Sequence, residues 1–112
     1  MPKPHWQQWE EEVAHRLGLS LTVCSGNQFQ DPGDATDKDP NTPYPLLVDC
    51  KFTERKSFSL KADTLRQWLE TGMLCGKMAI HAVRFKSDPD NDWVVLSLND
   101  FEELLFMARG SV

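Results

Sequence analysis

Two apolar segments of eight residues, separated by a stretch with helical spacing, constrain this chain more than any other feature. The segments are Leu46–Thr53 (LLVDCKFT) and Met78–Phe85 (MAIHAVRF), and both have the length and apolar character of buried strands. Between them, Leu60–Leu74 carries leucines and a tryptophan on one helical stripe. Because a helix that bridges two strands favours a parallel pair, the sequence predicts an α/β fold with a mixed sheet.

The remaining segments add further strands and a helix at each end of the chain. Gly18 follows the first helical stretch as a stop signal, and Asn99 with Glu102 resembles a capping box for the last helix. The expected segments are a helix over 6–17, a strand at Leu19–Cys24, a loop at Ser25–Pro45, a strand at Trp93–Leu98 and a helix at Phe101–Ala108. The predicted order is α-β-loop-β-α-β-β-α, in a single domain over residues 1–112 with a mixed central β-sheet flanked by helices.

Length, charge and residue counts limit the classes of protein that fit. A chain of 112 residues suits one domain. No apolar run approaches the roughly 20 residues of a membrane helix, and the N-terminus lacks a signal-peptide core, so we expect an intracellular protein. A net charge of −5 argues against binding nucleic acid by bulk positive charge. Three cysteines without C-x-x-C spacing predict reduced thiols, and three scattered histidines do not suggest a zinc site.

The strand Leu46–Thr53 carries an acid and a base two residues apart, Asp49 and Lys51. Because side chains alternate between the two faces of a strand, both must project from the same face. A partly buried carboxylate beside an ammonium group is costly unless the two are paired, hydrogen-bonded or engaged with a metal ion. The pair is therefore either a structural ion pair or half of a functional site.

A loop rich in Gly, Pro, Asn and Asp precedes this strand. Ser25–Pro45 is longer than most loops in a small domain, and such loops are often functional. Clustered acids in a loop indicate either a solvated segment or a site for a hard cation. The acids are Asp31, Asp34, Asp37 and Asp39. Asp34 precedes Asp49 by fifteen residues, a spacing that allows a hairpin arm to bring the two carboxylates together.

Pro32-Gly33-Asp34 followed by Asp49-Cys50-Lys51 resembles the signature of the PD-(D/E)xK nuclease superfamily. The order of elements is similar to that of its Holliday-junction-resolvase-like branch, which includes small phage-type endonucleases. The opening helix of that branch carries a glutamate in a pattern similar to Trp9–Gly18 (WEEEVAHRLG), and its next strand is similar to Gly76–Phe85. The likeness extends over residues 6–100. It implies a three-layer-like, restriction-endonuclease-type core and a cytoplasmic protein of a bacterium or a phage-infected cell.

The resemblance implies a role for each matching position. Asp34 and Asp49 would be the principal carboxylate ligands of Mg²⁺ or Mn²⁺, with the backbone carbonyl of Cys50 beside them. Glu10 would touch the metal ion or orient a water bound to it. Lys51 would position or help deprotonate the attacking water and stabilise the charge that grows on the phosphate. Asp49 stands where glutamate is commoner in the superfamily.

The chemistry of phosphodiester cleavage agrees with these residue types. Mg²⁺ takes oxygen ligands, keeps several waters and neutralises phosphate. Converging carboxylates without a cation repel one another and raise at least one pKa, while a lysine supplies a point charge. Two assignments stay open, because helix phase read from a sequence is uncertain by about a residue. Asp31 or Asp37 could replace Asp34, and Glu11 or Glu12 could replace Glu10.

These observations predict a magnesium-dependent endonuclease that acts on branched or otherwise structured DNA. The resemblance implies a homodimer, because related resolvases need two sites to cut two strands. The candidate DNA-contacting residues are Ser25, Lys56, Lys61 and Arg66. The three basic residues equally fit ordinary surface charge, and Ser25 equally fits a polar loop.

Two other interpretations compete with this prediction. A catalytically inactive nuclease-fold module could bind DNA, or a basic partner protein through its acidic loop. Alternatively, LLVDCKF holds only a buried ion pair in an unrelated small α/β protein. That last interpretation predicts that Asp34 lies far from Asp49.

Overall fold

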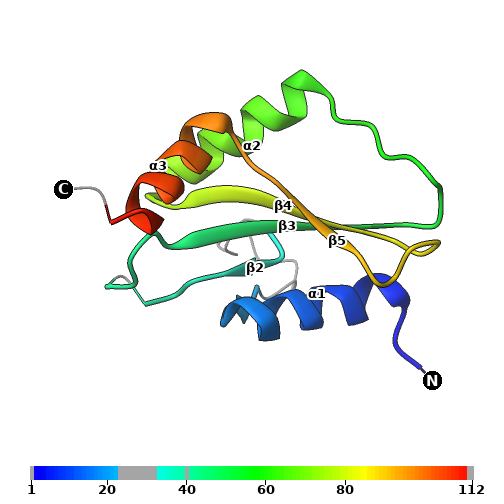
Figure 1. The fold of residues 1–112 in the computed structure, drawn as a ribbon. Helices are drawn as coiled ribbons and strands as arrows, with labels where there is room; N and C mark the ends of the chain where they lie inside the picture. Colours follow the sequence, from blue (N-terminus) through cyan, green and yellow to red (C-terminus); the bar gives the residue numbers. More distant parts are fainter. Residues whose placement is uncertain (1, 23–32, 40, 111–112) are drawn as a thin grey trace.

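The computed structural model describes residues 2–22, 33–39 and 41–110. Within them, helices flank a five-stranded sheet with the order β1-β2-β3-β4-β5 (Figure 1). The elements are α1 (His5–Leu17), β1 (Ser20–Leu21), β2 (Ala35–Thr36), β3 (Leu46–Thr53), α2 (Ala62–Cys75), β4 (Met78–Phe85), β5 (Asp92–Val95) and α3 (Leu98–Ala108). Strands β3 and β4 are parallel, and the other neighbours are antiparallel. The mixed sheet flanked by helices confirms the predicted fold class.

The central strands β3 and β4 have the bounds that the sequence predicted. They pair along their full length, from Leu46 opposite Met78 to Thr53 opposite Phe85. Helix α2 connects them and crosses β4 closely. A Cβ added to Gly72 of α2 would come within 2.7 Å of the Cβ of Ala79. The parallel pair therefore follows from the helical bridge, as expected.

Helix α1 covers one face of the sheet, and α2 and α3 lie on the other side (Figure 1). Trp9 and Val13 of α1 are buried in one core with Val48 of β3 and Ala82 of β4. The indole Nε1 of Trp9 donates a hydrogen bond of 3.2 Å to the carbonyl of Ala82. The helix ends at Gly18, whose φ of 68° and N–H bonds to the last turn confirm the predicted stop.

Strand β2 lies inside the segment that the sequence predicted as loop. Ala35 pairs with Val48 and Thr36 pairs with Leu47, so β2 continues the sheet beyond β3. Two residues are too few to give a recognisable alternation of apolar and polar side chains. Of the strand predicted at Leu19–Cys24, the described residues contain only β1.

The elements after β3 differ from the prediction mainly at their ends. The helix predicted at Leu60–Leu74 is α2 (Ala62–Cys75), and the strand predicted at Trp93–Leu98 is β5 (Asp92–Val95). Strand β5 ends early because the chain leaves the sheet to begin α3 at Leu98.

Helix α3 has a different N-cap from the one predicted. The side-chain Oγ of Ser97 accepts a hydrogen bond of 3.1 Å from the backbone N–H of Asp100. Serine is among the best N-cap residues, and here it takes that position two residues before Asn99. The capping box predicted at Asn99 and Glu102 is therefore wrong.

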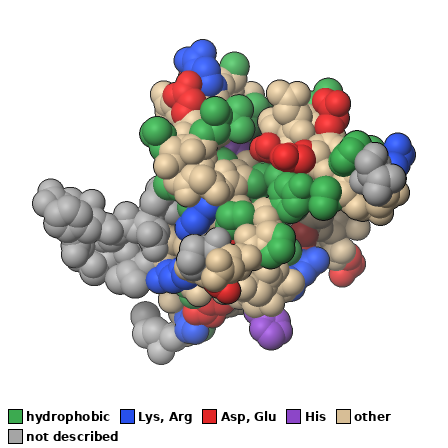
Figure 2. Space-filling view, turned by 90° about the vertical axis from the view of Figure 1, so that its left-hand side faces the viewer, with side chains coloured by type: hydrophobic (Ala, Val, Ile, Leu, Met, Phe, Trp, Pro, Cys, Tyr) green, Lys and Arg blue, Asp and Glu red, His purple; other side chains and the backbone are tan. Residues whose placement is uncertain are grey.

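Helix α3 lies on the surface and has no buried residue. It lies beside the end of α2, since Met73 and Asp100 line one hollow. Large apolar side chains of both helices are exposed. Figure 2 faces the left-hand side of Figure 1, and hydrophobic side chains gather in the upper half of that view. We call this set the α2/α3 apolar surface: Met73, Leu74, Leu98, Phe101, Phe106 and Met107. No helix in the described ranges is long and apolar enough to cross a lipid bilayer.

Candidate active site

Asp34 lies against the edge of β3, beside the residue that follows Asp49. Its backbone N–H donates to the carbonyl of Val48 at 2.8 Å, and its Oδ2 accepts a hydrogen bond of 2.7 Å from the N–H of Cys50. The structure therefore brings Asp34 to the Asp-Cys-Lys triplet. The interpretation as an isolated ion pair predicted the opposite placement of Asp34.

The backbone of Gly33 makes this placement of Asp34 possible. Gly33 has a φ of 81°, which favours glycine, and a Cβ there would lie 2.8 Å from the Trp68 ring and 3.0 Å from the Val48 carbonyl. The carbonyl of Gly33 accepts a hydrogen bond of 2.6 Å from Thr22 Oγ1. The chain thus turns away from β3 at Gly33, and the Asp34 carboxylate takes the N–H of Cys50 instead.

Asp49 and Lys51 lie on the same face of β3, as their spacing predicted. The Nζ of Lys51 is 3.2 Å from Oδ2 of Asp49. A third residue joins them: the parallel register places His81 of β4 opposite Asp49, and its Nδ1 is 2.9 Å from the same Oδ2. His81 is only 5% exposed. Asp49 is therefore half of an ion pair and also half of a buried carboxylate–imidazole contact.

A polar cavity of about 280 Å³ opens between this face of β3 and α2. Asp49, Lys51 and His81 form its sheet side. Its helix side is formed by Thr64, Gln67, Trp68 and Thr71 of α2. The cavity gives a ligand access to the Asp49–Lys51 pair.

Glu10 of α1 completes a group of three carboxylates around Cys50. Burial raises the pKa of the Cys50 thiol, and the charges of Asp34, Glu10 and Asp49 raise it further, in that order. Cys50 packs against the core on the side that α1 covers. The three acids near Cys50 therefore come from α1, from the residue before β2 and from β3 itself. The raised pKa keeps the Cys50 thiol protonated.

The electrostatics of these three acids differ. Burial, followed by the charges of Asp34, Asp49 and Glu11, raises the pKa of Glu10 to about 7. Burial also raises the pKa of Asp34, although the Cys50 N–H opposes this shift. Burial acts in the same direction on Asp49, but the hydrogen bond from His81 and the charge of Lys51 outweigh it and hold the pKa of Asp49 below its usual range.

The alternative acids named from the sequence are engaged elsewhere where they are described. Glu11 pairs with Lys3 at 2.7 Å. Asp37 Oδ2 accepts from the N–H of Leu46 at 2.8 Å. Glu12 pairs with Arg16 of α1 and Arg84 of β4, in a cluster described below. Asp31 lies outside the described residues. The charges of Asp34 and Asp49 both contribute to the raised pKa of Glu10.

The donor set suits a hard divalent cation. In the described part of the chain, no three His, Cys, Asp or Glu side chains stand close enough to hold one ion together. Mg²⁺ does not require such a cage, because it is usually held by one or two carboxylates and several waters. Residues of β3 alternate in the direction of their backbone groups, and Cys50 therefore directs its carbonyl to the same edge as the N–H that Asp34 contacts. The raised pKa values of Glu10 and Asp34 show negative charge that a cation would offset.

The predicted DNA-contacting residues are scattered. Lys56 and Lys61 are exposed in the segment between β3 and α2, which extends to the right in Figure 1. Arg66 is exposed, pairs with Asp63 at 3.0 Å, and lines a separate apolar cavity on the other side of Trp68. Ser25 lies outside the described residues. Their contact with DNA stays a prediction.

Sequence reasoning missed His81 as a member of this site. The three histidines are too scattered in the sequence for a zinc site, yet His81 stands in the middle of a mainly apolar strand. A titratable residue at such a position needs a partner, because burying an unpaired polar group is costly. The partner could not be named without the register between β3 and β4.

A second charged cluster surrounds Arg84 of β4, which lies opposite Asp92 of the edge strand β5. Its Nε and Nη2 are 2.7 and 2.8 Å from the two carboxylate oxygens of Asp92, and its Nη2 also pairs with Glu12. Arg16 reaches Asp92 at 2.7 Å, and the Arg84 guanidinium lies 4.3 Å from the centre of the Trp9 ring. We call Glu12, Arg16, Arg84 and Asp92 the arginine cluster.

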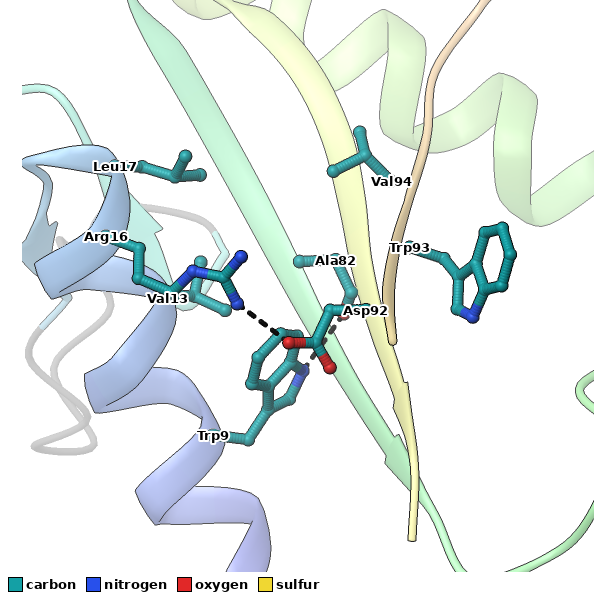
Figure 3. A pocket seen from close by; sticks show the side chains of 8 residues that line it. All are labelled: Trp9, Val13, Arg16, Leu17, Ala82, Asp92, Trp93 and Val94. Carbon is teal, nitrogen blue, oxygen red and sulfur yellow. Dashed lines mark hydrogen bonds and ion pairs between the residues drawn. The ribbon is translucent and has the colours of Figure 1, made fainter. Parts of the chain in front are cut away.

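The arginine cluster borders a small pocket of about 90 Å³ between α1 and β5 (Figure 3). Arg16 and Leu17 extend from α1 on one side, and Val94 lies across from them on β5, while Trp9 lies at the base. This pocket is on the α1 side of the sheet, away from the cavity that Asp49 and Lys51 line.

Comparison with known proteins supports the fold but not the sequence relationship. No family model matches the chain, and no curated protein matches its sequence. Among solved structures, the chain is similar to Hjc of Archaeoglobus fulgidus, a Holliday junction resolvase from an archaeal hyperthermophile. The TM-score is 0.60 at 15% identity, over 80% of this chain and 75% of that chain. At this identity, the likeness shows a shared fold alone.

Proposed function

We propose that this protein is a metal-dependent endonuclease that hydrolyses phosphodiester bonds in branched DNA. One observation carries the proposal: Asp34 contacts the backbone beside Asp49 at an edge of β3, with Lys51 and Glu10 on either side. The fold shared with a Holliday junction resolvase supports the choice of substrate.

Each residue of the site has a definite task in this proposal. Asp34, Asp49 and the Cys50 carbonyl would hold the metal ion, and a bound divalent cation would supply positive charge against the phosphate and lower the pKa of water. Lys51, partly exposed and 3.2 Å from Asp49, directs its ammonium group at the charge that develops on the phosphate. Glu10, whose pKa is raised in the metal-free protein by burial and by the charges of Asp34 and Asp49, would touch the metal ion or orient a water bound to it.

The exposed basic residues would contact the DNA backbone. Lys56 and Lys61 lie on the segment that follows the catalytic strand, and Ser25 and Arg66 complete the proposed contacts. The net charge of −5 disfavours approach to DNA, and a metal ion bound among the acids offsets part of it. Binding of DNA should therefore strengthen when the metal is present.

We further propose that the active form is a homodimer that joins through the α2/α3 apolar surface. Six large apolar side chains are exposed there, including Leu98 at 72% and Leu74 at 89%. Large apolar side chains that are exposed on neighbouring elements are typical of interaction sites. Two copies would provide the two active sites that cutting two strands requires.

One observation favours a second candidate function, a catalytically inactive module that binds DNA or a basic partner. The carboxylate of Asp49 is already paired with Lys51 and in hydrogen-bond contact with His81 within the protein. On this view the triplet is structural, and the acid-rich surface serves binding alone.

Cleavage of a labelled four-way junction distinguishes the two functions. Wild-type protein would be incubated with the junction in Mg²⁺, in Mn²⁺ and in EDTA, beside Asp49→Asn and Lys51→Met. The matched control is Glu70→Gln, an exposed acid on α2. We expect cleavage by wild type and by the control in divalent metal only, and its loss in both site variants. Binding without cleavage in either metal would favour the inactive module, and cleavage undiminished in both site variants would exclude this site.

A further inference from the structure

His81 is the one buried titratable partner of the site to which neither the sequence motif nor the shared fold gives a role. It comes from β4, whereas Asp49 and Lys51 come from β3, and the parallel register sets it opposite Asp49. Its side chain is almost fully buried, and it lines the polar cavity on one side and an apolar cavity of about 250 Å³ on the other. The ring is therefore held between α2 and the sheet.

The imidazole can donate to Asp49 in only one way. An ionised carboxylate only accepts hydrogen bonds, so Nδ1 must carry the proton in the 2.9 Å contact with Oδ2. The ring of Trp68 lies 6.1 Å from the His81 ring, centre to centre, and the Trp68 indole is itself fixed by a 2.9 Å hydrogen bond to the Ile80 carbonyl. Packing and hydrogen bonding thus restrict rotation of the imidazole.

Both donors to Asp49 use the same carboxylate oxygen. Lys51 Nζ and His81 Nδ1 lie 3.2 and 2.9 Å from Oδ2, and within the described residues no hydrogen bond to Oδ1 is present. Two donors on one oxygen fix the rotation of the carboxyl group and leave the other oxygen available. Partners of this kind orient metal-ligating side chains in many proteins.

We propose that His81 is a positioning residue that holds Asp49 through Nδ1 and Oδ2, so that Oδ1 of Asp49 is presented to a divalent cation. This inference rests on the proposed metal-dependent function. It assigns His81 no contact with the substrate. The hydrogen bond from His81 to Asp49, and not the bulk of the imidazole ring, raises the affinity for the metal ion.

Two amide replacements separate the hydrogen bond from the ring. Asparagine places its amide nitrogen close to the position of Nδ1, whereas glutamine places it close to that of Nε2. The variants are His81→Asn, His81→Gln and His81→Leu, with His15→Asn and His15→Leu as controls on the exposed last turn of α1. Each would be titrated with Mn²⁺ by calorimetry, and its fold checked by circular dichroism.

We expect His81→Asn to bind Mn²⁺ within about threefold of wild type, and His81→Gln and His81→Leu to bind about tenfold more weakly or worse. In an Asp49→Asn background, His81→Gln should cause no further loss, because the hydrogen bond acts only through Asp49. A structural role for the ring would instead lower thermal stability in all three variants and leave the affinity for Mn²⁺ unchanged.

The outcomes distinguish this inference from the proposed function. Wild-type protein that binds no Mn²⁺ would overturn both. If wild type binds Mn²⁺ and the folded His81→Gln variant binds it equally well, only the role of His81 is overturned. Equal weakening by asparagine and glutamine also overturns it, and that comparison remains decisive should His81→Leu fail to fold.

Discussion

Helix α1 contributes one glutamate to each of two charged clusters, and the two clusters are built on opposite principles. Glu12 joins the arginine cluster, where two acids meet two guanidinium groups. Glu10, two residues away, joins Asp34 and Asp49, where Lys51 pairs with Asp49. The first cluster is balanced in charge, and the second has an excess of acid.

The pKa shifts show what this difference does. The hydrogen bonds from Arg84 lower the pKa of Asp92, so the folded protein favours its charged form. Burial and neighbouring acids raise the pKa values of Glu10 and Asp34, so folding opposes their charged forms. Asp49 of the second cluster is the exception: burial raises its pKa, but the hydrogen bond from His81 and the charge of Lys51 outweigh burial and hold it low. A cluster that stabilises its own charges is typical of structure, and acids whose pKa values are raised by burial and by one another are typical of functional sites. Substitutions should therefore affect stability in one cluster and chemistry in the other.

The largest expected effect is on chemistry, from Asp34→Asn. Under the proposed function Asp34 is a metal ligand, and its removal should lower metal-dependent cleavage by about 10³-fold or more. The amide oxygen can still accept the N–H of Cys50, so the free energy of unfolding should change by less than about 1 kcal/mol. Junction cleavage and urea unfolding on the same preparation measure both. A loss of stability that matches the loss of activity would contradict the comparison.

Gly33→Ala should damage the site through its backbone. The new Cβ would meet Trp68 at 2.8 Å, and the φ of 81° is strained for alanine, so we expect a destabilisation of about 3 kcal/mol. Because Asp34 follows directly, affinity for Mn²⁺ should fall as well.

Gly72→Ala is the matched control for this substitution. Its Cβ would meet Ala79 equally closely, at 2.7 Å, where α2 crosses β4. It should destabilise the fold to a similar extent and leave Mn²⁺ affinity unchanged in calorimetry below the unfolding temperature. Equal losses of affinity in the two variants would mean that Gly33 has no particular connection to the site.

Asp92→Asn should affect stability alone. It leaves the partly buried guanidinium of Arg84 with Glu12 as its remaining acid, and we expect a loss of about 2 kcal/mol in urea unfolding. Cleavage per folded molecule should match that of wild type. A fall in turnover at full folding would show that the two clusters are coupled through α1.

The smallest effect is on the pH dependence of stability in EDTA. The folded pKa of Glu10 is raised from 4.5 to about 7, so its contribution is present below pH 4.5 and is lost as the pH rises through about 7. The lowered pKa of Asp92 has the opposite sign: its contribution is present above its unfolded pKa of about 4 and is lost as the pH falls further.

Between pH 4.5 and 7, Glu10 should lower the free energy of unfolding of the wild type by less than about 1 kcal/mol, because solvent screens a partly buried carboxylate. Glu10→Gln should remove this decline. Asp92→Asn should leave that decline in place. Urea unfolding at half-unit pH steps measures both slopes. An identical decline in wild type and Glu10→Gln would show that Glu10 does not carry the shift.

The sequence predicted the centre of the fold better than its edges. Leu46–Thr53 and Met78–Phe85 were recognisable because a mainly apolar segment of eight residues leaves few alternatives to a buried strand. The two residues of β2 carry no such pattern, and the N-cap of α3 at Ser97 was decided by a side chain two positions from the predicted one. Short elements depend on tertiary contacts that a local pattern does not contain.

The same limit applies to the site. Spacing along β3 placed Asp49 and Lys51 on one face, and the structure agrees. The approach of Asp34 was predicted from the fifteen-residue interval and from the family resemblance, and its contact with Cys50 shows it. The pairing of His81 with Asp49 depends on the register of two strands separated in the chain by a whole helix, which no local signal specifies.

The turn at Gly33 limits how the stability of this protein could be raised by engineering. Continuing the pairing of β2 with β3 would set Gly33 opposite Cys50, so that a main-chain carbonyl would occupy the place where the Asp34 carboxylate now sits. A longer β2–β3 pairing would therefore displace the Asp34 carboxylate from the site. Under the proposed function, this interruption of the strand pairing makes room for the metal ion. Engineering that extends the pairing should therefore give a more stable protein that no longer cleaves DNA.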